Sequence, residues 1–166
     1  MMGKLIVVVV LLVAGVLAYE NGRKIDETHV RAHYQAQLEA LRAFDEEAVC
    51  AAAADDFSLK VVERGEGPVG SATLDGAEAC ELNRQTLKLM QMMSGQTGGM
   101  VTIDVNYNIK SIELAPGGRS ATVESTSTAK VGDMLLSRSR NREELSRSFW
   151  RIRSHGGEVQ VWSYGR

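Results

Sequence analysis

The stretch "EEAVCAAAADDFSLKV", residues 46–61, decides both the fold and whether the chain carries an obvious catalytic pair. Small apolar residues and one cysteine lead into two adjacent carboxylates, and an apolar residue then recurs at every second position, from Phe57 to Leu59 and beyond. The alternation predicts a strand, and the run before it predicts a short helix that ends near Asp55 and Asp56.

The two carboxylates at this helix end are the first candidates for catalysis. Two neighbouring side chains at a helix end cannot easily point into one pocket, and their like charges raise the cost of burial. We therefore interpret Asp55 and Asp56 as a structural helix end that faces solvent or caps local backbone.

Two further helices flank this stretch. Residues 25–44 place apolar side chains at helical spacing, which predicts an amphipathic helix, and Asp45 can cap the short helix that follows. Downstream, "RGEGPVGSAT" indicates a glycine-rich loop. Asp75 then begins a third helix, with Glu78 in the position of a capping box.

In the C-terminal part of the sequence, apolar residues recur at every second position. "VTIDVNYNI" alternates, the apolar parity then shifts, and this shift predicts a bulge near Lys110 and Ser111. "APGGR" indicates a hairpin turn and "SATVESTSTAKV" a second strand, while "ELSRSFWRIRS" and "EVQVWSYG" predict two more strands joined at "HGG". The order predicts an α+β fold: three N-terminal helices packed on a curved antiparallel sheet, a cone-shaped, cystatin-like roll, preceded by one apolar N-terminal helix.

The N-terminus predicts export. An unbroken apolar run from Leu5 to Ala18 indicates a signal peptide or transmembrane anchor within residues 1–22, and residues 23–166 form the folded domain. We expect a single-pass inner-membrane protein that contacts the membrane through residues 4–19, with the domain in the periplasm. The alternative is secretion to the periplasm after cleavage near Ala18.

The expected compartment bears on whether the two cysteines form a disulfide. In an oxidising compartment Cys50 and Cys80 are expected to form one disulfide between two helices, and two buried thiols are the alternative. The net charge of -2 gives no reason to expect nucleic acid as a partner. His29 and His33 lie four residues apart, but no third ligand is evident, so we expect neither a metal nor a cofactor.

The element order, headed by "AHYQAQLEALRAFDEEAVCAAAADDFSL", resembles the nuclear transport factor 2-like superfamily, also called SnoaL-like, over residues 28–165. The resemblance implies that the curved sheet wraps the helices into a cone whose open end often forms an apolar pocket. That superfamily includes ketosteroid isomerase, epoxide hydrolases and dehydratases. It also includes non-catalytic domains on one N-terminal helix outside the cytoplasmic membrane, as in the inner-membrane assembly subunit of type IV secretion systems.

The resemblance argues against an enzyme. It places the isomerase's tyrosine at Gln37 and its catalytic base at or near Val61, so the base is missing. We predict no catalytic residue. The expected function is that of a non-catalytic, membrane-tethered domain that assembles with envelope proteins or with itself through the sheet's outer face, with Arg147, Arg151 and Arg153 as candidate contacts.

A pocket in the cone supports a different hypothesis, a binding module for a small apolar ligand. Its predicted lining is apolar and aromatic: Leu38, Leu41, Met90, Val101, Ile103, Val105, Tyr107 and Trp150. The same side chains could instead fill the cone as an ordinary core. An isomerase-like or dehydratase-like enzyme is the third hypothesis.

Overall fold

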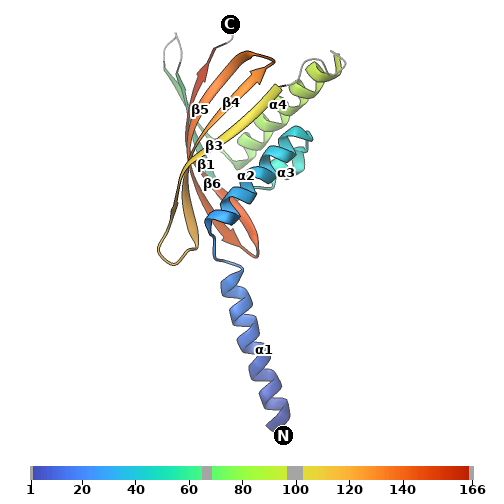
Figure 1. The fold of residues 1–166 in the computed structure, drawn as a ribbon, viewed down its shortest axis with the longest axis vertical. Coiled ribbons are helices and arrows are strands. Elements are labelled where there is room, and N and C mark those ends of the chain that lie inside the picture. The colour runs from blue at the N-terminus through green and yellow to red at the C-terminus, as the bar shows by residue number, and fades with distance from the viewer. Residues whose placement is uncertain (1, 65–68, 97–102, 165–166) are drawn as a thin grey trace.

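The computed structural model describes residues 2–64, 69–96 and 103–164, with side chains described from residue 10 onward. Helix α1 (Met2–Asn21) projects from one end of the domain (Figure 1). The remaining elements are α2 (Glu27–Arg42), α3 (Glu46–Cys50), β1 (Ala53–Arg64), β2 (Gly70–Asp75), α4 (Gly76–Gln96), β3 (Ile103–Leu114), β4 (Ser120–Val131), β5 (Met134–Ser148) and β6 (Arg151–Ser163).

The strands form one curved sheet in the order β2-β1-β6-β5-β4-β3. Neighbouring strands are antiparallel except β1 and β6, which run parallel. Helices α2, α3 and α4 lie on the concave side of the sheet (Figure 1). The prediction of helices packed on a curved sheet, preceded by one N-terminal helix, is therefore confirmed.

The predicted capping box at the start of α4 is confirmed. The Asp75 carboxylate accepts hydrogen bonds from the amides of Ala77 and Glu78, both at 2.9 Å, and the Glu78 carboxylate accepts from the Asp75 amide at 3.0 Å. The predicted cap of α3 is present too, because Asp45 accepts from the Ala48 amide at 3.0 Å. These local bonds satisfy amides that a helix start would otherwise leave without partners.

The buried core joins the start of α2 to the middle of the sheet. Val30, Val123 and Leu145 are fully buried there. The whole cluster comprises Ile25, Val30, Tyr34, Ala121, Val123 and Leu145, with Tyr107, Ile109, Ile112 and Ile152 packed against it. This core holds α2 against β3, β4 and β5, so residues on the inner face of α2 have fixed positions over the sheet.

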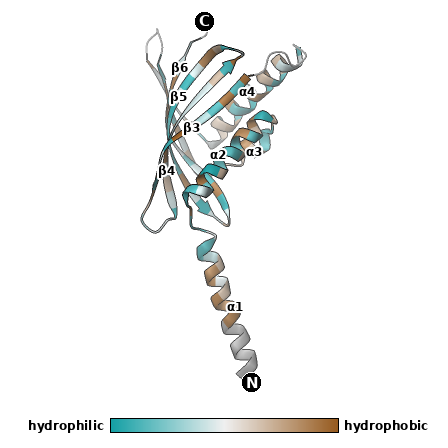
Figure 2. Cartoon of the chain, viewed as in Figure 1, coloured by the Kyte–Doolittle hydropathy of each residue, from teal (hydrophilic) through white to brown (hydrophobic). Residues whose placement is uncertain are grey.

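Helix α1 exposes its apolar side chains. The described ones, Val10, Leu11, Leu12, Val13, Val16 and Leu17, are 53–66% exposed, and Figure 2 shows the apolar colouring along this part of the helix. Within the part of the chain that the structure describes, no helix meets the length and hydropathy expected of a membrane span. The anchor and the periplasmic location stay predictions.

The boundary between helix and strand in residues 46–61 differs from the prediction. Helix α3 ends at Cys50, and Asp55 and Asp56 lie inside β1. Alanine favours helices, but Ala53 already pairs with Ser154 of β6, and this tertiary pairing overrides the local preference. Likewise, part of the predicted glycine-rich loop forms β2, the edge strand next to β1.

The predicted turn at "HGG" is also wrong. The turn between β5 and β6 lies at Phe149 and Trp150, and the "HGG" residues lie within β6. Glycines with positive φ occur in bulges as well as in turns, and here they accompany a register shift between β5 and β6. The bulge predicted near Lys110 and Ser111 is confirmed by a register shift between Ile109 and Ser111.

Gly156 and Gly157 have φ values of 85° and 145°, and no other residue fits at either position. A Cβ atom on Gly156 would overlap the backbone of Ser58 in β1. A Cβ atom on Gly157 would overlap the carbonyl oxygen of Arg142 in β5. The two glycines thus allow β6 to lie close to both of its neighbours.

We predict that Gly157→Ala destabilises the domain by about 3 kcal/mol or more, because backbone strain and the overlap with Arg142 add. Urea unfolding of the full chain in mild detergent, followed by tryptophan fluorescence, measures the change. Gly70→Ala is the matched control, since its nearest neighbour would be an ordinary 3.8 Å away. Its expected effect is within about 0.5 kcal/mol. Equal stabilities of the two variants would contradict the constraint.

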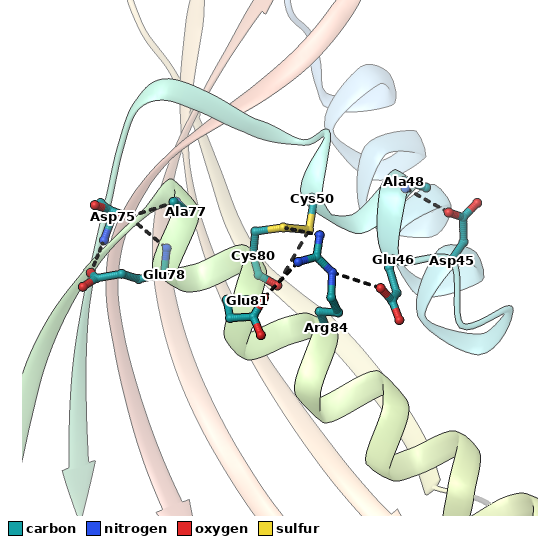
Figure 3. The surroundings of a disulfide bond; sticks show 10 residues. All are labelled: Asp45, Glu46, Ala48, Cys50, Asp75, Ala77, Glu78, Cys80, Glu81 and Arg84. Atoms are coloured by element: carbon teal, nitrogen blue, oxygen red, sulfur yellow. Dashed lines mark hydrogen bonds and ion pairs between the residues drawn. A yellow bond between two sulfur atoms is a disulfide. The ribbon is translucent and has the colours of Figure 1, made fainter.

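A disulfide between Cys50 and Cys80 joins the end of α3 to the first turns of α4 (Figure 3). Arg84 reinforces the same junction, because its Nε atom donates to the Glu46 carboxylate at 3.0 Å and its Nη1 atom to Glu81 at 2.9 Å. The disulfide closes a loop with a sequence separation of 30, and this loop contains β1 and β2. It therefore restrains the unfolded chain across two elements.

Replacing both cysteines by serine should destabilise the domain by about 3 to 4 kcal/mol, the chain-entropy value for a loop of this size. The free energy of unfolding, measured with and without reducing agent, checks this value. The control is Glu46→Gln, which removes a partly exposed ion pair at the same junction and should cost about 1 kcal/mol or less. A double variant as stable as the oxidised parent would refute the prediction.

Candidate functional site

A cavity of about 560 Å³ lies between the three domain helices and the concave face of the sheet. Helix α2 contributes His33, Tyr34 and Leu41, and the disulfide forms part of the wall. The apolar walls include Val49, Phe57, Leu59, Ala79, Tyr107, Val159 and Val161. The polar and charged lining includes Gln37, Asn83, Ser127, Ser137, Ser139, Asn141, Arg142, Glu143, Ser154 and Glu158.

The Glu143 carboxylate lies at the centre of the polar contacts. Its Oε2 atom accepts a hydrogen bond of 2.5 Å from the Tyr34 hydroxyl, and its Oε1 atom accepts one of 2.5 Å from the Ser154 hydroxyl. Tyr34 is 9% exposed and Ser154 is 4% exposed, so both donors are held in the interior. The carboxylate thus links α2, β5 and β6.

The environment keeps the neighbouring groups neutral. Burial, together with the adjacent Glu143 carboxylate, raises the pKa of Tyr34, so the phenol remains a hydrogen-bond donor. Burial, and then Glu143, also raise the pKa of Tyr107. Burial lowers the pKa of His33 although Glu143 acts in the opposite direction, which favours the neutral imidazole.

A row of small polar side chains continues from Glu143 along β5. The hydroxyls of Ser127 and Ser139 lie 2.7 Å apart, and the Ser139 hydroxyl donates to the Asn141 side-chain oxygen at 3.1 Å. The alternation of β5 brings Ser139, Asn141 and Glu143 to the same face. The cavity therefore has a polar strip along β5, and Val159 and Val161 of β6 lie directly beside it in the same sheet.

The arrangement can accept hydrogen bonds or hold a positive charge. Each carboxylate oxygen has about two acceptor sites, and the donors Tyr34 and Ser154 occupy one on each oxygen. The free acceptor sites of Glu143 are available to a ligand. Among the described residues no group of three potential metal ligands comes together.

The structure divides the predicted pocket residues between two cavities. Tyr107 lines the central cavity, and Leu41 lines both it and a second cavity of about 330 Å³. Met90, Ile103 and Val105 line the second cavity. Leu38 is half-buried and lines neither, and Val101 falls outside the described residues.

Trp150 was placed wrongly in the predicted pocket. It is 62% exposed at the turn between β5 and β6, away from the cavity. The strand predicted over "ELSRSFWRIRS" runs straight through this turn. Once the chain reverses at Phe149 and Trp150, strand parity no longer applies to it.

Glu143, Asn141 and Ser154 are the site residues that the sequence prediction missed. The run "NREEL" contains three consecutive charges, for which exposure is the default. One signal was present, since Asn141 and Glu143 share the parity of the apolar Leu145. Tyr34, the partner of Glu143, lies 109 residues away in sequence, and spacing alone could not pair them.

The three arginines proposed as interface residues have different environments. Arg147 donates to the carbonyl oxygen of Lys24 at 2.7 Å, and Arg153 donates to that of Ala53 at 3.0 Å. Arg151 is exposed. Arg153 thus fastens β6 to the start of β1, whereas Arg147 and Arg151 lie beside the turn between β5 and β6.

A second polar chain lies on the other face of the sheet. Asp56 and His155 Nδ1 are 2.6 Å apart, and His155 Nε2 and the Ser146 hydroxyl are 2.7 Å apart. The prediction that Asp56 meets only solvent or local backbone is wrong, as is the placement of His155 in a turn. None of the cavities described here is lined by these three residues. We assign the Asp56–His155–Ser146 contacts a structural role, because they connect β1, β6 and β5 at the bulge.

Comparisons with known proteins show the fold. No family model and no curated protein matches the chain. Among solved structures, a ketosteroid isomerase-like protein from Erwinia carotovora atroseptica is 19% identical, with a TM-score of 0.50 over 86% of this chain and 100% of that chain. An NTF2-like protein of unknown function from Shewanella oneidensis is 13% identical, with a TM-score of 0.53 over 80% of this chain and 97% of that one.

A third solved structure supports the same conclusion. It is a conserved protein from Planctomyces limnophilus, 16% identical, with a TM-score of 0.52 over 84% of this chain and 98% of that one. At these identities the similarity concerns the backbone alone. The domain therefore has the nuclear transport factor 2-like fold that the sequence resemblance implied.

Tyr34→Phe should destabilise the domain by about 1 to 3 kcal/mol, because it removes one of the two donors to Glu143 but keeps the ring in the core. The control is Tyr164→Phe on a side chain that is 55% exposed, for which a change within about 0.5 kcal/mol is expected. Urea unfolding of both variants measures the difference. If Tyr34→Phe were as stable as its control, the hydrogen bond to Glu143 would contribute nothing.

Proposed function

We propose that the domain binds a small amphipathic molecule with a cationic group in the central cavity, and that Glu143 contacts the cation. The observation that carries this proposal is the Glu143 carboxylate on the cavity wall, held by Tyr34 and Ser154. Both of these partners are neutral donors. They orient the carboxylate but leave its charge uncompensated.

Glu143 has no counter-charge paired with it among the described residues. Arg142 also lines the cavity, but its side chain is 67% exposed and its guanidinium pairs with Glu124 at 3.7 Å. None of the ion pairs recorded between described residues includes Glu143. His33 does not replace one, because burial lowers its pKa and favours the neutral ring. Glu143 is half-buried on the cavity wall, and a cationic ligand would give its carboxylate a partner where water is partly excluded.

The cavity's size and walls suggest the rest of the ligand. A volume of about 560 Å³ is within the range of small-molecule sites. Phe57, Leu59 and Val159 offer apolar surface, and the row of Ser139 and Asn141 offers hydrogen bonds beside Glu143. The expected ligand therefore combines an apolar body with an amine or similar cation. This revises the earlier hypothesis of a purely apolar ligand.

Acid–base catalysis is the second candidate, and the same carboxylate favours it. The expected base position, Val61, is an apolar residue of β1, but Glu143 brings a carboxylate into the cone from β5. Both carboxylate oxygens already accept hydrogen bonds of 2.5 Å, from Tyr34 and Ser154, and these bonds fix the carboxylate in the orientation of a binding group. Binding is therefore the better-supported function.

We also propose that the domain works outside the cytoplasm, tethered by α1. The Cys50–Cys80 disulfide supports an oxidising compartment, and the exposed apolar side chains of α1 support contact with a membrane. Assembly with envelope proteins or with a second copy stays a prediction, testable by the mass of the full chain extracted from its own membranes.

Phenethylamine, which is cationic at neutral pH, and neutral 2-phenylethanol form a matched pair of probes. Ligand-detected NMR with the full chain in detergent should show that the amine binds and that Glu143→Gln weakens its binding by about tenfold or more, the effect of losing one charge-assisted hydrogen bond. Binding of the alcohol should change little, because it carries no charge.

Glu124→Gln provides the control variant. Glu124 pairs with Arg140 and Arg142, is not part of the cavity lining, and has the same chemistry as Glu143. Amine binding should survive this change. Equal amine binding to Glu143→Gln and the parent would contradict the proposal. A second outcome would also contradict it: the amine does not bind, and the protein extracted from its own membranes has a native mass with no bound small molecule.

A further inference from the structure

The turn between β5 and β6 presents two aromatic side chains to solvent. Phe149 is 76% exposed and Trp150 is 62% exposed. Both have positive φ, 48° and 69°, which costs a non-glycine residue on the order of 1–3 kcal/mol. A strained turn that holds large apolar groups in water indicates a surface made for contact.

This turn is fastened to the end of α1. The Trp150 amide donates to the Gly22 carbonyl oxygen at 3.1 Å, and the Tyr19 and Phe149 rings meet edge to face at 6.3 Å. The Trp150 indole also fills the space beside Gly22, where a Cβ atom would lie 3.1 Å from Nε1. The aromatic turn and the base of α1 therefore form one surface.

Positive charge surrounds the aromatic residues. Residues 19–26 and 147–151, with Arg119 of the adjacent turn, hold five basic and two acidic side chains. The Arg147 guanidinium lies 5.2 Å from the Trp150 ring centroid, and Arg23 donates to the Tyr19 hydroxyl at 2.8 Å. Arg119 pairs with Glu20 at 3.2 Å, so the net charge of this region stays positive.

The tip surface is defined as Tyr19, Arg23, Arg147, Phe149 and Trp150. We propose that this tip surface binds an anionic phospholipid bilayer at the level of the headgroups. Tryptophan and tyrosine favour that level, and basic side chains beside it attract anionic lipid. Helix α1 leaves the domain from the same end (Figure 1), and its described apolar side chains are exposed. This contact would fix the orientation of the domain and does not depend on what the cavity binds.

The charge and the neighbouring helix favour lipid over a protein partner. The surface combines aromatic groups with arginines, and the exposed apolar stretch of α1 continues from it directly. Two of the arginines expected at an interface, Arg147 and Arg151, flank this turn. Contact with lipid headgroups would therefore explain why Arg147 and Arg151 lie at this surface, without a protein partner.

Trp150 can report its own environment. In the Trp162→Phe background it is the remaining tryptophan of the full chain. This protein is reconstituted into vesicles of phosphatidylcholine alone or mixed with phosphatidylglycerol. We expect Trp150 emission to shift to shorter wavelength and acrylamide quenching to fall, both more strongly with phosphatidylglycerol. Lipids brominated near the headgroup should quench more than lipids brominated near the chain end.

Phe149→Asn is the test variant, because asparagine tolerates positive φ and removes the apolar ring without disturbing Trp150's contacts with Gly22. It should reduce the protection of Trp150 from acrylamide. Met134→Asn is the matched control, since Met134 is 60% exposed at the opposite end of β5. It should leave the protection unchanged.

Three outcomes would overturn the proposal. One is a Trp150 that remains as accessible to acrylamide in both vesicle types as in detergent. Another is a protein that fails to associate with either vesicle. The third is protection of Trp150 only in native membranes and not in pure lipid, which would assign the surface to a protein partner.

Discussion

The close approach of β6 to both of its neighbours is the constraint on which the rest of the domain depends. Gly156 and Gly157 have no side chains, and this lets the strand pass against the backbones of Ser58 and Arg142. The accompanying bulge leaves Ser154 on the inner face of the sheet, beside Glu143, and His155 on the outer face. The polar strip of the cavity and the polar chain across the outer face both follow from this local backbone geometry.

The site is built from elements that are far apart in sequence and that each have a separate reason for their position. Helix α2 is held by the core around Val30 and Leu145, and it carries Tyr34 to the carboxylate. Helix α4 is held by its capping box and by the disulfide, and it closes the opposite wall. Loss of any one of these supports would move a wall of the cavity without touching Glu143.

Sequence reasoning recovers the elements that local signals determine. The strand at 120–131, the bulge after Ile109 and the caps at Asp45 and Asp75 are all visible from spacing and residue type. It fails where a long-range pairing overrides a local preference. The alanines after Cys50 pair with β6 instead of extending α3, and the glycines that resemble a turn serve a bulge.

The candidate site was less predictable than the fold for a related reason. A glutamate among charged neighbours is normally exposed, and only the partners that Glu143 meets in three dimensions hold it, half-buried, on the cavity wall. Tyr34 falls within the amphipathic helix predicted over residues 25–44, but nothing near it in the sequence indicates that its hydroxyl has a carboxylate partner. Apolar residues were easier to place, since Leu41 and Tyr107 do line the cavity.

The place of β6 in the sheet also has a consequence for the synthesis of the chain. It is the last of the described strands in sequence, yet it lies between β1 and β5. Until it is added, the sheet consists of two separate pieces, and each has an open edge able to pair with other chains. A chain that stops before Arg151 would keep both edges open and would lack Ser154. The domain therefore needs the residues of β6 before these two edges are covered, and until then the edges are open to aggregation.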